Sequence, residues 1–163
     1  MLILSLPRIQ DCIDKLNKAY RMSKLDVTLR CWQMRIAEKN ISKTTFNMRY
    51  GKYEFPMISY GLMNVSATFQ TLMNSILRSY IYKFVLVYLD DALVYFNSDE
   101  EHLQHLRLVF EALWKHQIYA RPKKCIFNKP NVEFCDHIVG QGVIKVLESK
   151  VRVIKDWSQP KNV

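Results

Sequence analysis

The stretch FVLVYLDDALVYF, residues 84–96, places two acidic side chains between two almost wholly apolar runs. The first run is apolar on both alternating faces, which is typical of a central strand that is covered on each side. Asp90 and Asp91 then fit a tight hairpin turn, with ALVYF returning as the second strand. Because Asp is also a common turn residue, this pair alone does not separate chemistry from a simple turn.

The composition indicates one ordered domain with an excess of positive charge. The 163 residues include 24 Lys and Arg against 15 Asp and Glu, a formal net charge of +9, and 49% of them are hydrophobic. A chain of this length can bury a sizeable core. The basic excess favours a polyanionic partner, because side chains that neutralise phosphates release condensed counterions. A generally basic, solvated surface explains the charge equally well.

The cysteines favour a reduced, intracellular setting. Cys12, Cys31, Cys125 and Cys135 form no Cys-x-x-Cys pair, so a disulfide framework is not expected. A zinc site drawn from Cys125, Cys135 and His137 has irregular spacing and is the less favoured interpretation. The N-terminal segment lacks a basic leader and the longest apolar run is too short to span a bilayer. We therefore expect no membrane association.

Periodicity predicts an alternation of helices and paired strands. Helical spacing of apolar residues is expected over residues 7–20, 64–82 and from a capping box at Ser98 and Glu101 onward. Strand character is expected over residues 22–27, 33–36, 44–57, 84–96 and 132–146, with Pro56 ending its strand early. This order fits an α+β fold in which helices pack on one face of an antiparallel sheet.

A third acid strengthens the case for chemistry at the acidic pair. Asp26 ends the extended segment MSKLD, so Asp26, Asp90 and Asp91 meet at one sheet edge if both strands lie centrally. Like charges at such an edge repel one another, and divalent cations remove the conflict. Two ions about 3.5–4 Å apart can activate an attacking hydroxyl and stabilise a leaving oxygen. The acids and the basic composition together point to nucleotidyl transfer on nucleic acid.

An ordered series of motifs resembles the reverse transcriptases of gypsy-type long-terminal-repeat retroelements. From about residue 6 to residue 163 the chain carries SKLD, TTF, RYGKYEF, YGLMN, ATFQ, YLDD, EEHLQHLRLVFEAL, KKC, VEF and PKNV. The resemblance implies a reverse-transcriptase palm with a ferredoxin-like core and part of the fingers. It implies one domain over residues 1–163, without the thumb, connection and ribonuclease H regions. The implied activity is RNA-directed DNA polymerisation on a primed RNA or DNA template with deoxynucleoside triphosphates.

The resemblance also implies the roles of the acids. Asp26 and Asp90 are implied to ligate two Mg²⁺ ions, for which Mn²⁺ can substitute, and Asp91 completes the acidic cluster. Gly61 and Gln70, in the block YGLMNVSATFQ, match positions on the nucleotide and template side. Lys124, in KKC, matches a lysine near the incoming phosphates, where a cation would aid the departing pyrophosphate. An ordinary surface lysine is the equally favoured alternative for that position.

Several positions of the nucleotide pocket depart from the family pattern. Cys31 stands where an aromatic residue usually packs against the sugar, and Leu29 and Arg30 stand where a small residue and Gly are usual. Trp32 could replace the missing ring only if the backbone shifted by one residue. Further departures are Ser59, Val65, Ser66, Cys135 and Asp136. These changes keep a second function open, a non-catalytic remnant that binds nucleic acid or another protein.

Overall fold

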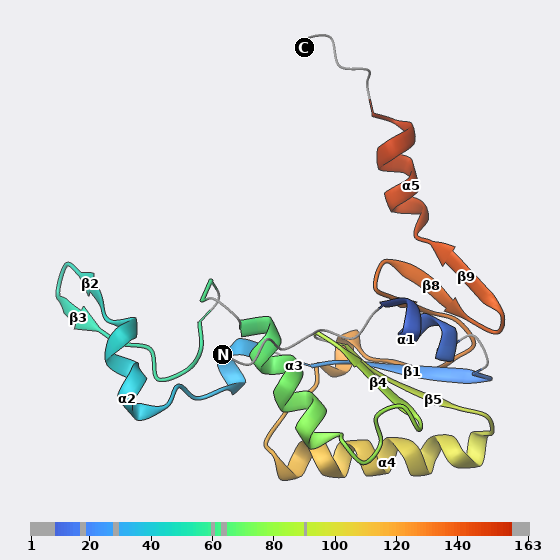
Figure 1. Ribbon diagram of the computed structural model, residues 1–163, viewed down its shortest axis with the longest axis horizontal. Helices are drawn as coiled ribbons and strands as arrows, with labels where there is room; N and C mark the ends of the chain where they lie inside the picture. Colours follow the sequence, from blue (N-terminus) through green and yellow to red (C-terminus); the bar gives the residue numbers. More distant parts are fainter. Residues whose placement is uncertain are drawn as a thin grey trace.

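The computed structural model of the chain (Figure 1) describes residues 9–16, 19–27, 30–59, 61–62, 65–89 and 91–157. At residues 9–11, 13, 30 and 31 it describes the course of the backbone alone. Within these ranges the chain forms a central four-stranded sheet, a second sheet of three strands, and an arm that extends away from both (Figure 1).

The central sheet is antiparallel, with its strands in the order β4-β5-β1-β6. These strands are β1 (Arg21–Asp26), β4 (Val85–Tyr88), β5 (Asp91–Phe96) and β6 (Ile126–Lys129). The predicted strand over residues 22–27 and the predicted hairpin over residues 84–96 are both present. However, β4 is an outer strand and not a central one, because β6 occupies the far side of β1 and leaves β4 at the opposite edge.

Two helices, α3 (Val65–Ile76) and α4 (Asp99–Lys115), cover one face of the central sheet. The core on this face includes Leu25, Phe69, Met73, Val85, Val94 and Val109. Helix α4 begins as predicted, since the Glu101 N–H donates to Ser98 Oγ at 3.3 Å. Helix α3 ends earlier than the predicted helix, because the chain turns back toward β4 and Tyr82 has a φ of +64°, which a right-handed helix excludes.

The opposite face is covered by α1 (Ile9–Leu16) and by the second sheet, in the order β7-β8-β9. Its strands are β7 (Val132–Phe134), β8 (His137–Gly140) and β9 (Val143–Val146), so the strand character expected over residues 132–146 is present as three strands. The core on this side includes Cys12, Leu16, Met22, Leu86, Leu93 and Phe134. The α+β fold is confirmed, but the helices do not all pack on one face as expected, because the apolar side of α1 is buried against the other face. Helix α1 lies opposite α3 and α4, so the apolar hairpin is buried on both faces, as its pattern predicted.

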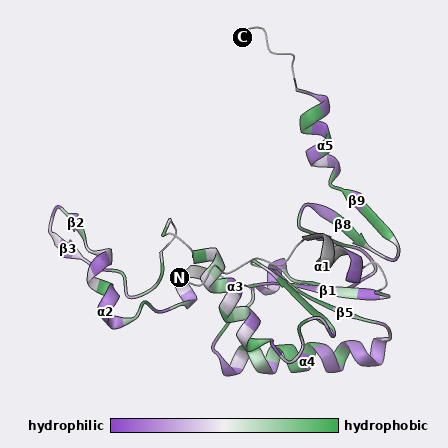
Figure 2. Ribbon diagram, viewed as in Figure 1, coloured by the Kyte–Doolittle hydropathy of each residue, from purple (hydrophilic) through white to green (hydrophobic). Residues whose placement is uncertain are grey.

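The arm, residues 35–57, contains α2 (Glu38–Ile41), the 3-10 helix η2 (Ser42–Thr44), and a hairpin of β2 (Phe46–Met48) and β3 (Gly51–Tyr53). The strand character expected over residues 44–57 is present in both strands, and β3 ends before Pro56 as expected. The strand expected over residues 33–36 does not form. Gln33 ends the 3-10 helix η1 (Arg30–Gln33), and Arg35 makes only an isolated bridge to Met57. Figure 2 shows the β4–β5 hairpin mainly in the hydrophobic colour, whereas the arm mixes both colours.

Helix α5 (Glu148–Lys155) follows β9 and was not predicted from the sequence pattern. It projects away from both sheets in Figure 1, and its apolar side chains Val153 and Ile154 are exposed. None of the described helices is long and apolar enough to cross a membrane. The three cysteines whose side chains are described, Cys12, Cys125 and Cys135, carry free thiols.

Candidate active site

Asp26 and Asp91 lie directly opposite each other, where β1 ends and β5 begins at one rim of the central sheet. Opposed residues of an antiparallel pair have Cβ atoms about 4.5–5.5 Å apart and side chains on the same face. Asp90 lies outside the described residues; in the sequence it stands between Leu89 and Asp91. The structure therefore brings Asp26 and Asp91 together, and the position of the Asp90 carboxylate stays a prediction.

Each of these two carboxylates contacts a cation from the same chain. Arg121 Nε and Nη2 lie 2.7 and 2.6 Å from Asp26 Oδ1. Lys24 Nζ lies 2.8 Å from Asp91 Oδ2. Both acids are largely shielded from water, with side-chain exposures of 16% for Asp26 and 24% for Asp91. The two cations offset the repulsion between neighbouring carboxylates.

The end of β4 and Leu89, which follows it, are held by the buried side chain of Gln70, from α3. Gln70 Oε1 accepts a hydrogen bond from the Leu89 N–H at 2.7 Å. Its Nε2 donates to the Val87 carbonyl oxygen at 3.1 Å and to Asn74 Oδ1 at 2.9 Å. Leu89 has a φ of +52°, as tight hairpin turns require. The amide of Gln70 thus holds the backbone at Val87 and Leu89, and its expected place on the nucleotide and template side stays a prediction.

A second tight turn lies beside this rim. Cys135 and Asp136 join β7 to β8 with φ values of +49° and +62°, so both residues of the turn have the positive φ of a type I′ hairpin. They line a cavity of about 290 Å³ together with Lys24 and Asp91. Burial raises the pKa of the Cys135 thiol to about 12. The thiol is therefore protonated at neutral pH in the metal-free protein.

The described residues contain no group of three or more His, Cys, Asp or Glu side chains that could hold a metal ion. The less favoured zinc site at Cys125, Cys135 and His137 is accordingly not formed. Instead, His137 Nδ1 lies 2.7 Å from the Cys135 carbonyl oxygen. The rim supplies Asp26 and Asp91, and the third acid of the predicted magnesium site is outside the described part of the chain.

The other predicted site residues lie on separate segments. Gly61 is exposed and has a φ of +92°. Lys124 is exposed and ends the 3-10 helix η3 (Pro122–Lys124), close in sequence to Arg121. Cys31 lies in η1, where its backbone alone is described. The neighbouring Trp32 is 42% exposed, and its ring lies edge-on to Phe55 at 6.2 Å. Contact of Gly61, Cys31 and Lys124 with a nucleotide stays a prediction.

Sequence reasoning missed Lys24, Arg121 and Gln33. Lys24 could have been found, since residues two apart on a strand share a face and Lys24 precedes Asp26 by two. Arg121 is 95 residues from Asp26, and no spacing signals their contact. The Gln33 amide exchanges two hydrogen bonds with the Tyr119 backbone, 86 residues away, which is equally invisible in the sequence.

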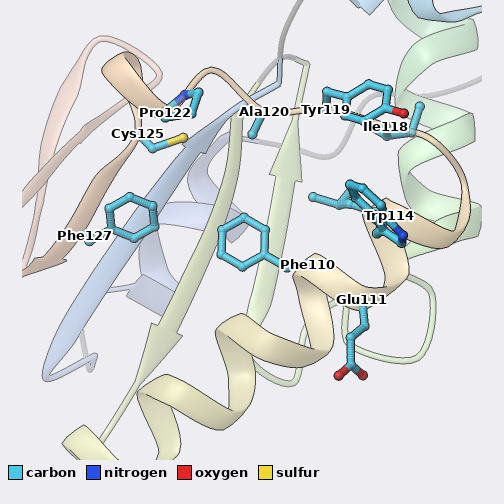
Figure 3. Close-up of a pocket in the computed structure, with 10 residues that line it drawn as sticks. Phe110, Glu111, Trp114, Ile118, Tyr119, Ala120, Pro122, Cys125 and Phe127 are labelled. Carbon is cyan, nitrogen blue, oxygen red and sulfur yellow. The ribbon is translucent and has the colours of Figure 1, made fainter.

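A larger cavity, of about 650 Å³, is mainly apolar, and neither Asp26 nor Asp91 lines it (Figure 3). The rings of Phe110, Trp114, Tyr119 and Phe127 line it, between the end of α4 and the start of β6. The Glu111 carboxylate points away from these rings in Figure 3. None of the predicted site residues with a described side chain lines this cavity, so the rim remains the place where charged groups converge.

Comparisons with known proteins agree with the motifs. The family of reverse transcriptases (RNA-dependent DNA polymerases) matches residues 2–139. The chain is 36% identical over 155 residues to the retrovirus-related Pol polyprotein from transposon 297 of Drosophila melanogaster, which covers 95% of this chain and 15% of that protein. It is 31% identical over 155 residues to the corresponding polyprotein from transposon gypsy, with 95% and 15% covered. An RNA-directed DNA polymerase homolog of Oenothera berteroana is 46% identical over 110 residues, which cover 66% of this chain and 78% of that protein.

Solved structures share the fold at low sequence identity. The foamy viral protease-reverse transcriptase dRH in complex with double-stranded DNA aligns with a TM-score of 0.88 and 19% identity, covering 98% of this chain and 28% of that one. The foamy viral protease-reverse transcriptase in complex with an RNA/DNA hybrid aligns with a TM-score of 0.84 and 19% sequence identity. The alignment covers 98% of this chain and 21% of that one. The chain thus spans a small part of the retroelement polyproteins and viral enzymes that it matches. Its family is nevertheless clear, and the chain belongs to the reverse transcriptases (RNA-dependent DNA polymerases).

Proposed function

We propose that this chain forms the palm of an RNA-directed DNA polymerase and supplies the carboxylates for nucleotidyl transfer to a primer. The observation that carries the proposal is the register of β1 and β5, which sets Asp26 opposite Asp91 at one rim of the central sheet. Asp90 immediately precedes Asp91 in the sequence. Carboxylates on paired strands of a packed sheet are held in position by the core beneath them, which is what phosphoryl transfer demands.

The donor set at the rim suits Mg²⁺. Asp26, Asp91 and, by chain order, Asp90 offer carboxylate oxygens, the ligands that Mg²⁺ prefers. When bound, such ions would activate the primer hydroxyl and neutralise charge on the leaving oxygen.

The chain's own residues would orient the reactants. A primer 3′-hydroxyl loses its proton and its oxygen bonds to the α-phosphorus of a deoxynucleoside triphosphate, while pyrophosphate leaves. Gln70 keeps the turn before Asp90 in place through its bonds to Val87 and Leu89. Lys124, exposed on η3, is the proposed contact for the departing phosphates. The net charge of +9 favours binding of a primed RNA or DNA template.

Primer extension tests this function directly. The chain, joined to the segments that flank it in its polyprotein, should extend a DNA primer on an RNA template in Mg²⁺. Asp26→Asn and Asp90→Asn should each lower the rate by roughly a thousandfold or more, because ligand carboxylates are lost. Asp136→Asn is the matched control, since its carboxylate lies on the neighbouring turn and pairs with Lys150. Extension that survives Asp90→Asn would refute the proposal.

One observation favours a second candidate, a non-catalytic remnant that binds nucleic acid. Asp26 and Asp91 are each already paired with a cation of this chain, so these two carboxylates are neutralised without metal. Such a remnant should bind RNA–DNA hybrids in a salt-sensitive manner. Its affinity should not change in Asp90→Asn, and no primer extension should appear even with the flanking segments present.

A further inference from the structure

The segment that follows α4 is tied to the end of β1 by a continuous set of contacts. Ala120 forms an isolated antiparallel bridge with Val27. The Arg121 N–H then donates to the Asp26 carbonyl oxygen at 2.8 Å. The backbone of Arg121 is therefore anchored to the same residue whose carboxylate it contacts. Such an anchor keeps the guanidinium within reach of the rim.

A second tie links this segment to the loop that follows Asp26. The Tyr119 N–H donates to Gln33 Oε1 at 2.8 Å, and Gln33 Nε2 donates to the Tyr119 carbonyl oxygen at 3.2 Å. Gln33 ends η1, the 3-10 helix that contains Cys31. The segment that follows α4 is consequently tied both to the end of β1 and to η1. The backbone from which the Arg121 side chain extends is therefore held in place.

The guanidinium of Arg121 makes two contacts with a single oxygen. Nε and Nη2 both approach Asp26 Oδ1, at 2.7 and 2.6 Å. The arginine side chain is 41% exposed, while that of Asp26 is 16% exposed. The more accessible partner can therefore move outward into solvent, whereas the carboxylate stays at the rim.

We propose that Arg121 is a built-in competitor of the divalent cation: it occupies the Asp26 carboxylate in the metal-free protein and must swing aside when a metal ion binds. The inference rests on the proposed function, because it concerns the same carboxylate. Arg121 is a positioning residue in this scheme. It aims Asp26 at the rim and sets how much metal is needed to load the site.

Simple electrostatics gives the direction of the effect. A divalent cation takes a carboxylate oxygen at about 2.0–2.1 Å for Mg²⁺, and Oδ1 is the oxygen that both guanidinium nitrogens contact. A positive charge held beside that oxygen also repels the incoming ion, since the interaction falls only as the inverse of distance. Removing the charge should therefore tighten metal binding, even though it loosens the metal-free rim.

Binding of Mn²⁺ to the full 163-residue chain, followed by the electron paramagnetic resonance signal of free Mn²⁺, measures this competition without any turnover. Arg121→Gln should bind Mn²⁺ about tenfold more tightly than the wild type, the order expected for a partly exposed charge pair acting on a divalent ion. Lys123→Gln is the matched control, because it removes the same charge from the exposed face of η3. Its affinity should change by less than about twofold. Arg121→Lys, which keeps the charge and loses the fork, should fall between the two.

Thermal unfolding in a metal chelator checks that the ion pair itself exists. Arg121→Gln should lower the melting temperature in the wild-type background and have no effect in Asp26→Asn, as a double-mutant cycle requires. Far-ultraviolet circular dichroism establishes that each variant is folded before Mn²⁺ is added. If Arg121→Gln does not fold, the same cycle is made with Arg121→Lys.

The outcomes separate the two proposals. In one outcome the wild type binds Mn²⁺, Asp26→Asn abolishes that binding, and Arg121→Gln binds no more tightly than the wild type. This outcome overturns the proposed competition but leaves the proposed metal site of the polymerase intact. If neither the wild type nor any variant binds Mn²⁺, although the double-mutant cycle shows the Arg121–Asp26 ion pair, both the competition and the metal site are overturned. If Lys123→Gln tightens Mn²⁺ binding as much as Arg121→Gln does, the proposed competition is overturned as well. The effect would then come from the net charge of the chain.

Discussion

The central sheet and the arm are held together by different kinds of contact. Around the sheet, core side chains such as Leu25 and Leu93 of the strands and Phe69 of α3 are completely buried, and they meet across layers. In the arm no residue is buried, and its contacts join near neighbours. Phe46, for example, stacks on Phe55 with ring centroids 4.9 Å apart. The sheet thus depends on burial of apolar surface, and the arm depends on local hydrogen bonds and rings.

A narrow base joins the two regions. The Ile36 N–H donates to the Pro56 carbonyl oxygen, and the Ile58 N–H donates to that of Met34, both at 2.9 Å. Met34 and Ile58 contact the core beneath the sheet, whereas the residues beyond them do not. Changes in the core should therefore reach the carboxylate rim, while changes in the arm should stay local.

The largest contrast is expected for two phenylalanines. Phe69→Ala, in the core, should lower the free energy of unfolding by about 4 kcal/mol, because it removes buried surface and leaves a cavity. Phe46→Ala, in the arm, should cost about 1 kcal/mol, the order of one aromatic pair. Urea denaturation followed by circular dichroism measures both losses. Equal losses would mean that the arm and the sheet are not energetically distinct.

A smaller contrast is expected for two hydrogen-bonding side chains. Gln70→Leu leaves the Val87 carbonyl and the Leu89 N–H unpaired below the Asp90 turn, at a cost of about 2 kcal/mol. Primer extension should fall at least about tenfold, since the turn loses its position.

The matched variant in the arm is Thr44→Val. Thr44 Oγ1 donates to the Ile41 carbonyl at 2.7 Å and accepts from the Phe55 N–H at 2.8 Å. Its loss should cost about 1 kcal/mol and leave extension on a short template unchanged within about threefold. A Gln70→Leu protein with normal extension would show that the turn does not need this support.

The smallest expected effect depends on pH. His102, from α4, stacks on Phe96 at 4.0 Å and lies 2.8 Å from Ser23 Oγ. Burial lowers the pKa of His102 below its ordinary value of 6.5, with Asp99 opposing this and His105 adding to it. The unfolded chain therefore takes up the proton first, so stability should fall as pH drops through 6.5 toward the lowered pKa of the folded state.

The comparison of regions sharpens this test, because the arm contains no histidine. Chemical denaturation between pH 7.5 and pH 5 should show a slope that His102→Gln reduces and that His116→Gln, an exposed position, does not. Amide hydrogen exchange should report the loss in the sheet and not in the arm. If the pH dependence of the unfolding free energy is the same in His102→Gln and in the wild type, groups other than His102 cause it.

Much of the fold followed from local patterns. Alternating and helical spacing of apolar residues predicted β1, the β4–β5 hairpin, α1, α4 and the terminal strands, because each pattern reflects which face is buried. The edge position of β4 and the early end of α3 were not predicted. Both depend on partners distant in sequence, since β6 completes the sheet and the turn at Tyr82 redirects the chain.

The candidate site divides in the same way. Asp26 and Asp91 stood out in the sequence because acids interrupt or end apolar strands. Gln70 was singled out by motif, but its task below the turn became visible only when its hydrogen bonds were seen. Arg121 was not singled out at all. A contact across 95 residues leaves no trace in periodicity or spacing.

By itself the sequence determined the family, the strands that carry the acids, and the buried faces of the main elements. Those properties depend on neighbours along the chain, where the chemical pattern is explicit. Only the tertiary structure decided that Asp26 stands opposite Asp91, that Gln70 supports the turn, and that Arg121 and Lys24 hold the two carboxylates. The physical reason is that strand register and ion pairing depend on distances in space between remote segments, which packing of the whole core establishes.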